Sequence, residues 1–363
     1  MDEAAARAHF RGASHRKRTD LLAQIILGIG TSHTPMLTLG SEEWTHRAAD
    51  DLRNQKLNQS DGTWISYDAL LAKVGPAYAD QVTPDALSDL ADACQRSLDR
   101  LATELATAAP DVVVIVGDDQ SELFGPQNMP VIALFHGEDV VTFDRWGDEG
   151  APAWVRTMGR GYAMDAVNHF PGAPDFATKL IAELLERDID IASSARIDDP
   201  HRAGFGHAFG FVIRRLIGER TIPVVPLLIN TYYPPNVPSA RRCHDIGRAL
   251  RDAIGAIPDD LRIAVVASGG LSHFIVDEAL DRRVIDGFRP DQADLLRDLP
   301  RGALMSGSSE ILNWVVTAGA VDHLPLKWLD YYPAFRTPAG TGVGTCFAVW
   351  ADDRGIGGDD VSA

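Results

Sequence analysis

The sequence predicts a single α/β domain with a central, mostly parallel sheet flanked by helices. Short β-branched runs alternate with longer segments of helical periodicity, which is the order expected of βαβ units. Several of the runs contain no polar position, as in strands that are covered on both faces. No internal repeat or low-complexity linker divides the 363 residues, so we expect one domain over 25–352, with a flexible N-terminal extension, 1–24, and a flexible tail, 353–363.

Composition and charge limit the partners of this domain. With 45% hydrophobic and 23% charged residues, the chain has the composition of an ordinary soluble protein. A net charge of -17 argues against nucleic acid and anionic membranes, which both bind basic surfaces. No apolar run approaches the roughly 18 residues of a membrane span, and the charged start of the chain lacks the apolar core of a signal peptide. The three cysteines, Cys94, Cys243 and Cys346, have no disulfide or zinc spacing, so we expect a cytoplasmic protein.

The first strand is expected over 25–29, directly before the loop that carries His33. Pro35 lies in this loop and cannot continue a strand ladder. The segment 42–84 is polar and mixed, and we expect it to be an excursion that covers the site. Apolar residues then recur at helical spacing over 85–108, until Pro110 ends the helix.

Three further buried strands are expected at 112–116, 222–229 and 263–266, and each is followed by polar residues. Asp118, Asp119 and Gln120 follow the first of them. Two glycines and then His273 follow the last. Shorter strands are expected at 129–135 and 189–197, and helices at 176–187, 239–254 and 277–286.

Ionisable side chains therefore gather where strands end, which is where open α/β sheets bind ligands. Glu310 is expected in the first turn of a late helix whose N-cap is Ser308 or Ser309, and it could serve that cap alone. His273 could likewise belong to a simple turn. Two imidazoles and a carboxylate with open positions hold non-haem Fe(II) for oxygen chemistry, so convergence of these residues would predict an iron site.

Four segments, in this order, resemble the class III extradiol ring-cleavage dioxygenases over nearly the whole chain. They are Ile29-Gly-Thr-Ser-His33-Thr-Pro35, the acidic loop after 112–116, Ser268-Gly-Gly-Leu-Ser-His273 and Ser306-Gly-Ser-Ser-Glu310. The resemblance, to protocatechuate 4,5-dioxygenase and the gallate and 3-O-methylgallate dioxygenases, implies Fe(II), O₂ and a small catecholic aromatic acid. We also expect a homodimer.

The same resemblance assigns roles to individual residues. His33 and Glu310 match metal ligands, and His273 matches the acid-base histidine, a role that suits an imidazole because its pKa lies near neutrality. A further histidine that contacts the substrate corresponds best to His207, in a glycine-rich aromatic loop, although a packing role is equally expected there.

The second metal ligand departs from the family pattern, because Gln120 stands where the protocatechuate enzymes have a histidine. An amide oxygen binds Fe(II) more weakly than imidazole does. Gln120 through its oxygen, Asp119, or a histidine from elsewhere such as His207 could fill this position. A relative without oxygenase activity that binds a ligand or partner in the same cleft, and a hydrolase using another divalent metal, are the alternative functions.

Overall fold

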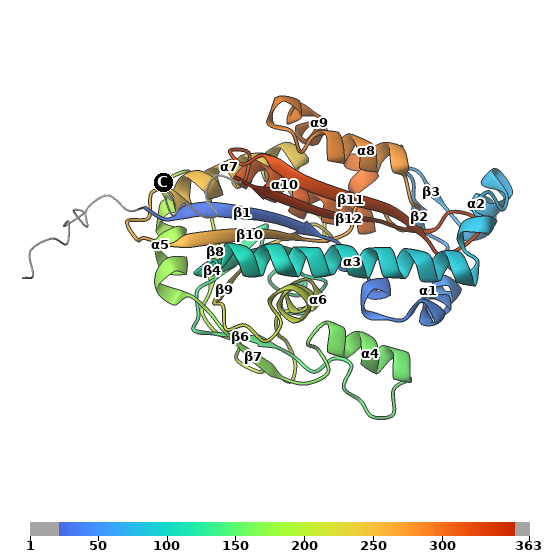
Figure 1. Ribbon diagram of the computed structural model, residues 1–363, viewed down its shortest axis with the longest axis horizontal. Coiled ribbons are helices and arrows are strands. Elements are labelled where there is room, and N and C mark those ends of the chain that lie inside the picture. Colours follow the sequence, from blue (N-terminus) through green and yellow to red (C-terminus); the bar gives the residue numbers. More distant parts are fainter. Residues whose placement is uncertain (1–21, 353–363) are drawn as a thin grey trace, which may run out of the picture.

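An eight-stranded sheet runs through the protein, in the order β11-β12-β1-β10-β4-β9-β5-β8 (Figure 1). The structure is a computed structural model and describes residues 22–352. The predicted flexible tail and all but the last residues of the predicted N-terminal extension lie outside this range. The described chain joins the sheet slightly earlier than expected, because Gln24 already begins β1 (Gln24–Thr31).

Four parallel strands form the centre of the sheet: β1, β10 (Arg262–Ser268), β4 (Val112–Asp118) and β9 (Val224–Ile229). Alternate side chains of β4 enter two different cores, Val112, Val114 and Val116 on one face and Val113 and Ile115 on the other. Helices cover both faces, which explains why these strands contain almost only apolar residues. The predicted fold class and the four predicted central strands are confirmed.

Antiparallel strands flank this centre. On one side β12 (Gly342–Ala351) pairs with β1 and with β11 (Leu326–Phe335). On the other, β5 (Ile132–Phe135) runs antiparallel to β9, and β8 (Ala192–Ser194) completes the sheet. The strands β5 and β8 are shorter than the predicted 129–135 and 189–197. Two small sheets lie outside the main one: β2 (Leu57–Asn58) with β3 (Trp64–Ile65), and β6 (Asp139–Thr142) with β7 (Asn168–Pro171).

Each face of the sheet has its own helices. One core includes side chains of α5 (Pro174–Leu185), α7 (Ala240–Ile254), α8 (Glu278–Asp286), α9 (Asp294–Arg297) and α10 (Ile311–Ala320). The other includes α3 (Pro84–Ala108), α4 (Ala153–Gly161) and α6 (His207–Val212), which continues as a π-helical turn, Ile213–Ile217. Within residues 22–352, no helix is both long and apolar enough to cross a lipid bilayer.

The predicted excursion lies beyond the carboxyl ends of the central strands and includes α1 (Trp44–Asp51) and α2 (Tyr67–Val74) (Figure 1). Two buried contacts attach α1. The indole Nε1 of Trp44 donates to the Met36 carbonyl at 2.9 Å, and both oxygens of Asp51 accept from the Arg336 guanidinium at 2.7 and 3.0 Å. Arg336 directly follows β11, so this ion pair fixes the excursion to the sheet.

Candidate metal centre

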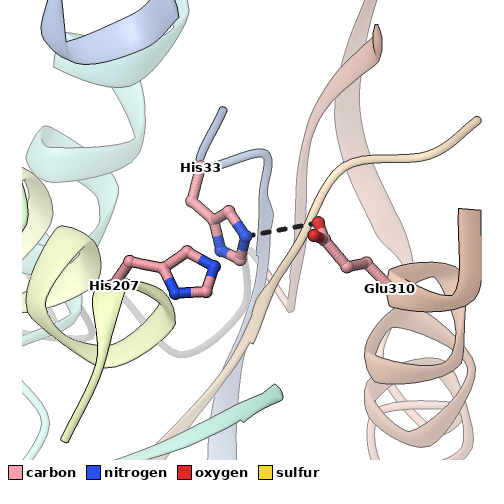
Figure 2. A group of neighbouring side chains, drawn as sticks. All are labelled: His33, His207 and Glu310. Carbon is pink, nitrogen blue, oxygen red and sulfur yellow. Dashed lines mark ion pairs between the residues drawn. The ribbon is translucent and has the colours of Figure 1, made fainter. Parts of the chain in front are cut away.

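Three buried side chains from distant parts of the chain meet beyond the ends of the central strands. His33 follows β1, His207 is the first residue of α6, and Glu310 ends a 3-10 turn, Gly307–Glu310, directly before α10. Their ligand atoms lie within 4.8 Å of one another, and Figure 2 shows His33 directed at the Glu310 carboxylate with His207 beside it. Two histidines and a glutamate in this arrangement could hold a divalent metal ion.

The hydrogen bonds of His33 leave one ring nitrogen free. Its Nδ1 lies 2.9 Å from the Ser268 hydroxyl, which itself donates to the Ala208 carbonyl at 2.6 Å. The serine therefore accepts the Nδ1 proton, which leaves Nε2 as the ring atom that could bind a metal. Among the described residues this buried Nε2 has no hydrogen-bond partner, and it lies 3.2 Å from Glu310 Oε2. An imidazole nitrogen without a hydrogen-bond partner beside a carboxylate fits a metal ion.

A carboxylate orients His207 in the same way. The Nδ1 of His207 lies 2.7 Å from Glu122 Oε1, which also accepts the backbone N–H of His207 at 3.2 Å. Burial opposes a positive charge on His207, but the carboxylates of Glu122, Asp118 and Glu310 outweigh it and raise the pKa to about 9. A bound metal would replace the proton that this environment favours on Nε2.

Glu310 lies between His33 and His273. Its Oε2 accepts the backbone N–H of Gly270 at 2.7 Å, and its Oε1 lies 3.3 Å from Nε2 of His273. Burial disfavours the carboxylate charge, but His273 and His33 overcome this effect and hold the pKa of Glu310 well below its usual range. The group is therefore an anion at neutral pH, as metal binding requires.

The predicted serine cap of α10 is wrong, and Glu310 itself occupies the N-cap position without a side-chain cap. The Ser308 hydroxyl instead accepts the backbone N–H of His273 at 2.9 Å and donates to the His273 carbonyl at 2.8 Å. Ser308 thus ties the His273 loop to the segment that carries Glu310.

His273 lines the same cavity as the three-residue group. Its Nδ1 donates to the Leu271 carbonyl at 2.8 Å, which leaves Nε2 directed toward Glu310. Burial disfavours the imidazolium, but Glu310 raises the pKa of His273 overall. The loop is anchored by buried Asp281, which accepts the Ser272 backbone N–H and hydroxyl, both at 2.8 Å, and the Tyr331 hydroxyl at 2.7 Å.

Gln120 and Asp119 have other contacts. The Gln120 amide Nε2, rather than its oxygen, faces Asp118 at 3.3 Å and Glu310 at 3.4 Å. The Asp119 carboxylate accepts the backbone N–H groups of the three residues 122–124, at 2.8 to 3.2 Å, and so caps its own loop. The structure therefore brings His207 to His33 and Glu310, with Gln120 at the side and Asp119 turned away.

A cavity of about 210 Å³ opens beside these groups and has aromatic walls that include Trp146, Tyr162 and Phe274. Sequence reasoning missed Glu122, although an acidic residue in the loop after a buried strand was a signal for it. It also missed Arg47, which lines the cavity from α1 and has no signal in the mixed composition of the excursion.

Comparison with known proteins agrees with the resemblance seen in the sequence. Residues 75–344 match the family model of the catalytic LigB subunit of aromatic ring-opening dioxygenase. Gallate dioxygenase of Pseudomonas putida is 33% identical over 137 residues, which cover 34% of this chain and 38% of the relative. A 2,3-dihydroxyphenylpropionate/2,3-dihydroxicinnamic acid 1,2-dioxygenase of Comamonas testosteroni is 29% identical over 167 residues, 46% of this chain and 44% of the relative.

An enzyme of the same name from Rhodococcus sp. is 28% identical over 220 residues, covering 58% of this chain and 60% of the relative. The chain thus matches less than two thirds of the length of these relatives. The family model, in contrast, covers most of the chain, including the loop of Gln120 and three of the four site residues, His207, His273 and Glu310. The chain therefore belongs to the LigB family of catalytic subunits of aromatic ring-opening dioxygenases.

Proposed function

We propose that the protein is a non-haem Fe(II)-dependent dioxygenase that uses O₂ for extradiol cleavage of a small catecholic aromatic acid of the protocatechuate, gallate or 3-O-methylgallate type. One observation carries the proposal: buried His33, His207 and Glu310 meet beside an aromatic-walled cavity that His273 also lines. Family membership and the named relatives support the same reaction class.

In this proposal His33, His207 and Glu310 hold the metal, and His207 takes the position for which Gln120 and Asp119 were the other candidates. Fe(II) bound by three protein ligands supplies open positions for the catechol oxygens and O₂. The protein prepares the ligands through Ser268 and Glu122, which accept the Nδ1 protons of the two histidines. Such outer contacts fix the orientation of a ligating imidazole and increase its basicity.

His273 is the proposed acid-base residue. Its Nδ1 proton is held by a backbone carbonyl, so Nε2 is the atom that would take a proton from a catechol hydroxyl and later return it. This Nε2 lies 3.3 Å from Glu310 Oε1, which places it beside the proposed metal. The aromatic side chains of Trp146, Tyr162 and Phe274 would pack against the ring and exclude water.

The experiment is anaerobic reconstitution with Fe(II), followed by O₂-uptake and absorbance assays with the three candidate acids. We expect about one bound iron for each chain, and one O₂ consumed for each ring opened. Glu310→Ala should abolish both iron binding and turnover. An unmodified protein that binds iron but opens no catechol would instead favour a ligand-binding relative without oxygenase activity. Hydrolysis supported by another divalent metal would favour the hydrolase.

A homodimer and a cytoplasmic location remain predictions for this enzyme. Light scattering of the full chain tests the first, and fractionation of the source cells tests the second.

A further inference from the structure

We infer that Arg47 selects substrates that carry a carboxylate, by binding that group in the cavity beside the metal centre. The inference rests on the proposed function and deepens it, because it names the residue that would distinguish an acidic catechol from a neutral one. Arg47 lines the same cavity as His33 and His273 but comes from the excursion rather than from the sheet.

The position of Arg47 is fixed from both sides. Trp44 lies three residues before it and Asp51 four residues after it, so all three share one face of α1. Trp44 and Asp51 are buried and attach this face to Met36 and Arg336. Arg47 is therefore directed into the cavity by a helix that is held at both ends. A preorganised side chain of this kind loses less freedom when it binds a ligand.

The guanidinium of Arg47 has an unused donor. Its Nη1 donates to Asp50 Oδ2 at 3.1 Å, but Asp50 is about half exposed and is shared with Arg53 at 3.0 Å. Its Nε is buried and has no hydrogen-bond partner among the described residues. A buried N–H without a partner is costly, and a carboxylate that enters the cavity would remove this cost.

The neighbouring ion pair shows how this side of a guanidinium binds a carboxylate. Arg336 uses its Nε and Nη2 to bind the two oxygens of Asp51, at 2.7 and 3.0 Å. In Arg47 the internal partner is on Nη1 instead, and the buried Nε is the donor left without a partner among the described residues. Paired donation of this kind is the strongest way in which arginine recognises a carboxylate.

The other two arginines that line the cavity, Arg336 and Arg145, already contact carboxylates of the protein. Arg336 donates from Nε and Nη2 to both oxygens of Asp51. Arg145 lies 3.6 Å from the Glu122 carboxylate, and its side chain is 42% exposed. Arg47 also lines the cavity, and its Nη1 donates to Asp50, whose side chain is about half exposed. Arg47 thus supplies local positive charge in a protein whose net charge is -17.

A binding experiment isolates this role from turnover. The probes are 4-hydroxybenzoate and its neutral isostere 4-hydroxybenzamide, titrated calorimetrically into the full chain with and without Fe(II). We expect Arg47→Met to weaken binding of the acid by about 10- to 100-fold, as loss of hydrogen bonds to a charged group implies, and to leave the amide unchanged. Arg47→Lys keeps the charge without the paired donors, so its affinity for the acid should lie between those of the unmodified protein and Arg47→Met.

Arg156 provides a matched control, because its Nε is also buried without a partner in the described chain, yet it does not line this cavity. Arg156→Met should leave binding of both probes unchanged. Equal affinity of the unmodified protein for acid and amide, or an equal loss for both probes in Arg47→Met, would overturn the inference.

Turnover then separates the inference from the proposed function. With protocatechuate and 3,4-dihydroxybenzamide as substrates, Arg47→Met should lose the preference for the acid in kcat/KM and retain activity on the amide. If the unmodified protein opens neither ring while Arg47 still discriminates the two binding probes, the proposed function fails and the inference stands. If both rings are opened equally well with or without Arg47, the inference fails and the proposed function stands.

Discussion

Replacing Glu122 with glutamine tests whether His207 is a metal ligand that a carboxylate prepares for binding. Glutamine keeps an oxygen that can accept the Nδ1 proton of His207, but it removes the buried negative charge beside the ring. Loss of such an outer partner typically weakens metal binding by about 10- to 100-fold. At saturating metal, the same change lowers the metal-dependent stabilisation of the fold by ~1.4 to 2.7 kcal/mol.

The effect of Glu122→Gln should depend on pH. In the unmodified protein the pKa of His207 is about 9, so at pH 7 a metal ion must displace a proton from the ring. This competition weakens the apparent affinity at pH 7 by roughly 100-fold, and it fades as the pH approaches 9. The variant lacks the charge that raises the pKa. The metal affinity of the variant should therefore rise less between pH 7 and 9. The full loss of metal affinity, about 10- to 100-fold relative to the unmodified protein, should appear only at pH 9.

Anaerobic competition with a metal-buffering chelator measures the affinity at each pH. Asp139→Asn is the matched control, because Asp139 contacts Nδ1 of His169 at the same 2.7 Å but both side chains are more than half exposed and neither lines the cavity. It should change neither affinity nor pH dependence. If Glu122→Gln also leaves both unchanged, the carboxylate does not act through a ligating His207.

Three further changes test the supports of the site. Asp51→Ala should lower the free energy of unfolding by ~3 to 5 kcal/mol in urea denaturation, because it leaves the buried Arg336 charge unpaired, whereas Asp50→Ala should change it by less than about 1 kcal/mol. A similar loss in both variants would contradict this explanation. Burial raises the pKa of Asp281 to about 6, so the folded protein binds this proton more tightly than the unfolded chain, and stability should fall as the pH rises from about 4 to 6. This pH-dependent part of the free energy of unfolding is worth ~3 kcal/mol and should vanish in Asp281→Asn. If the stability of that variant still falls equally steeply with pH, another group causes the dependence. His273→Gln should retain bound iron and lose turnover by about 10²- to 10⁴-fold, and loss of iron instead would make His273 a ligand.

Strand composition made much of the fold predictable. The central strands are covered on both faces, so they are continuous apolar runs that stand out from the rest of the sequence. Because the carboxyl ends of parallel strands share one edge of a sheet, the same runs also predicted that His33 and His273 lie at that edge. The short strands β5 and β8 were less well predicted, because their limits are set by pairing partners rather than by their own residues.

The remaining parts of the site depend on tertiary contacts that leave no local pattern. His207 lies 174 residues after His33 in the chain, and it approaches His33 because α6 packs against β4. From the sequence, a role in the site could not be separated from a packing role in an aromatic loop. The serine cap failed for a similar reason, because the hydroxyl of Ser308 is used by the backbone of His273. Local propensity could not anticipate either contact.

The attachment of the excursion has a consequence for how this scaffold can diversify. The proposed iron ligands are held by the sheet and its helices, whereas Arg47 is carried by a short helix with buried attachments at Trp44 and at the Asp51–Arg336 ion pair. Exchanging residues 42–52 between relatives while keeping these two anchors would exchange the recognition of the ring substituent and leave the oxygen chemistry in place. In the two proposals made above, the carboxylate of the substrate is bound from α1 and the metal is held by the sheet, so a library confined to α1 would test whether the first function can be changed without the second.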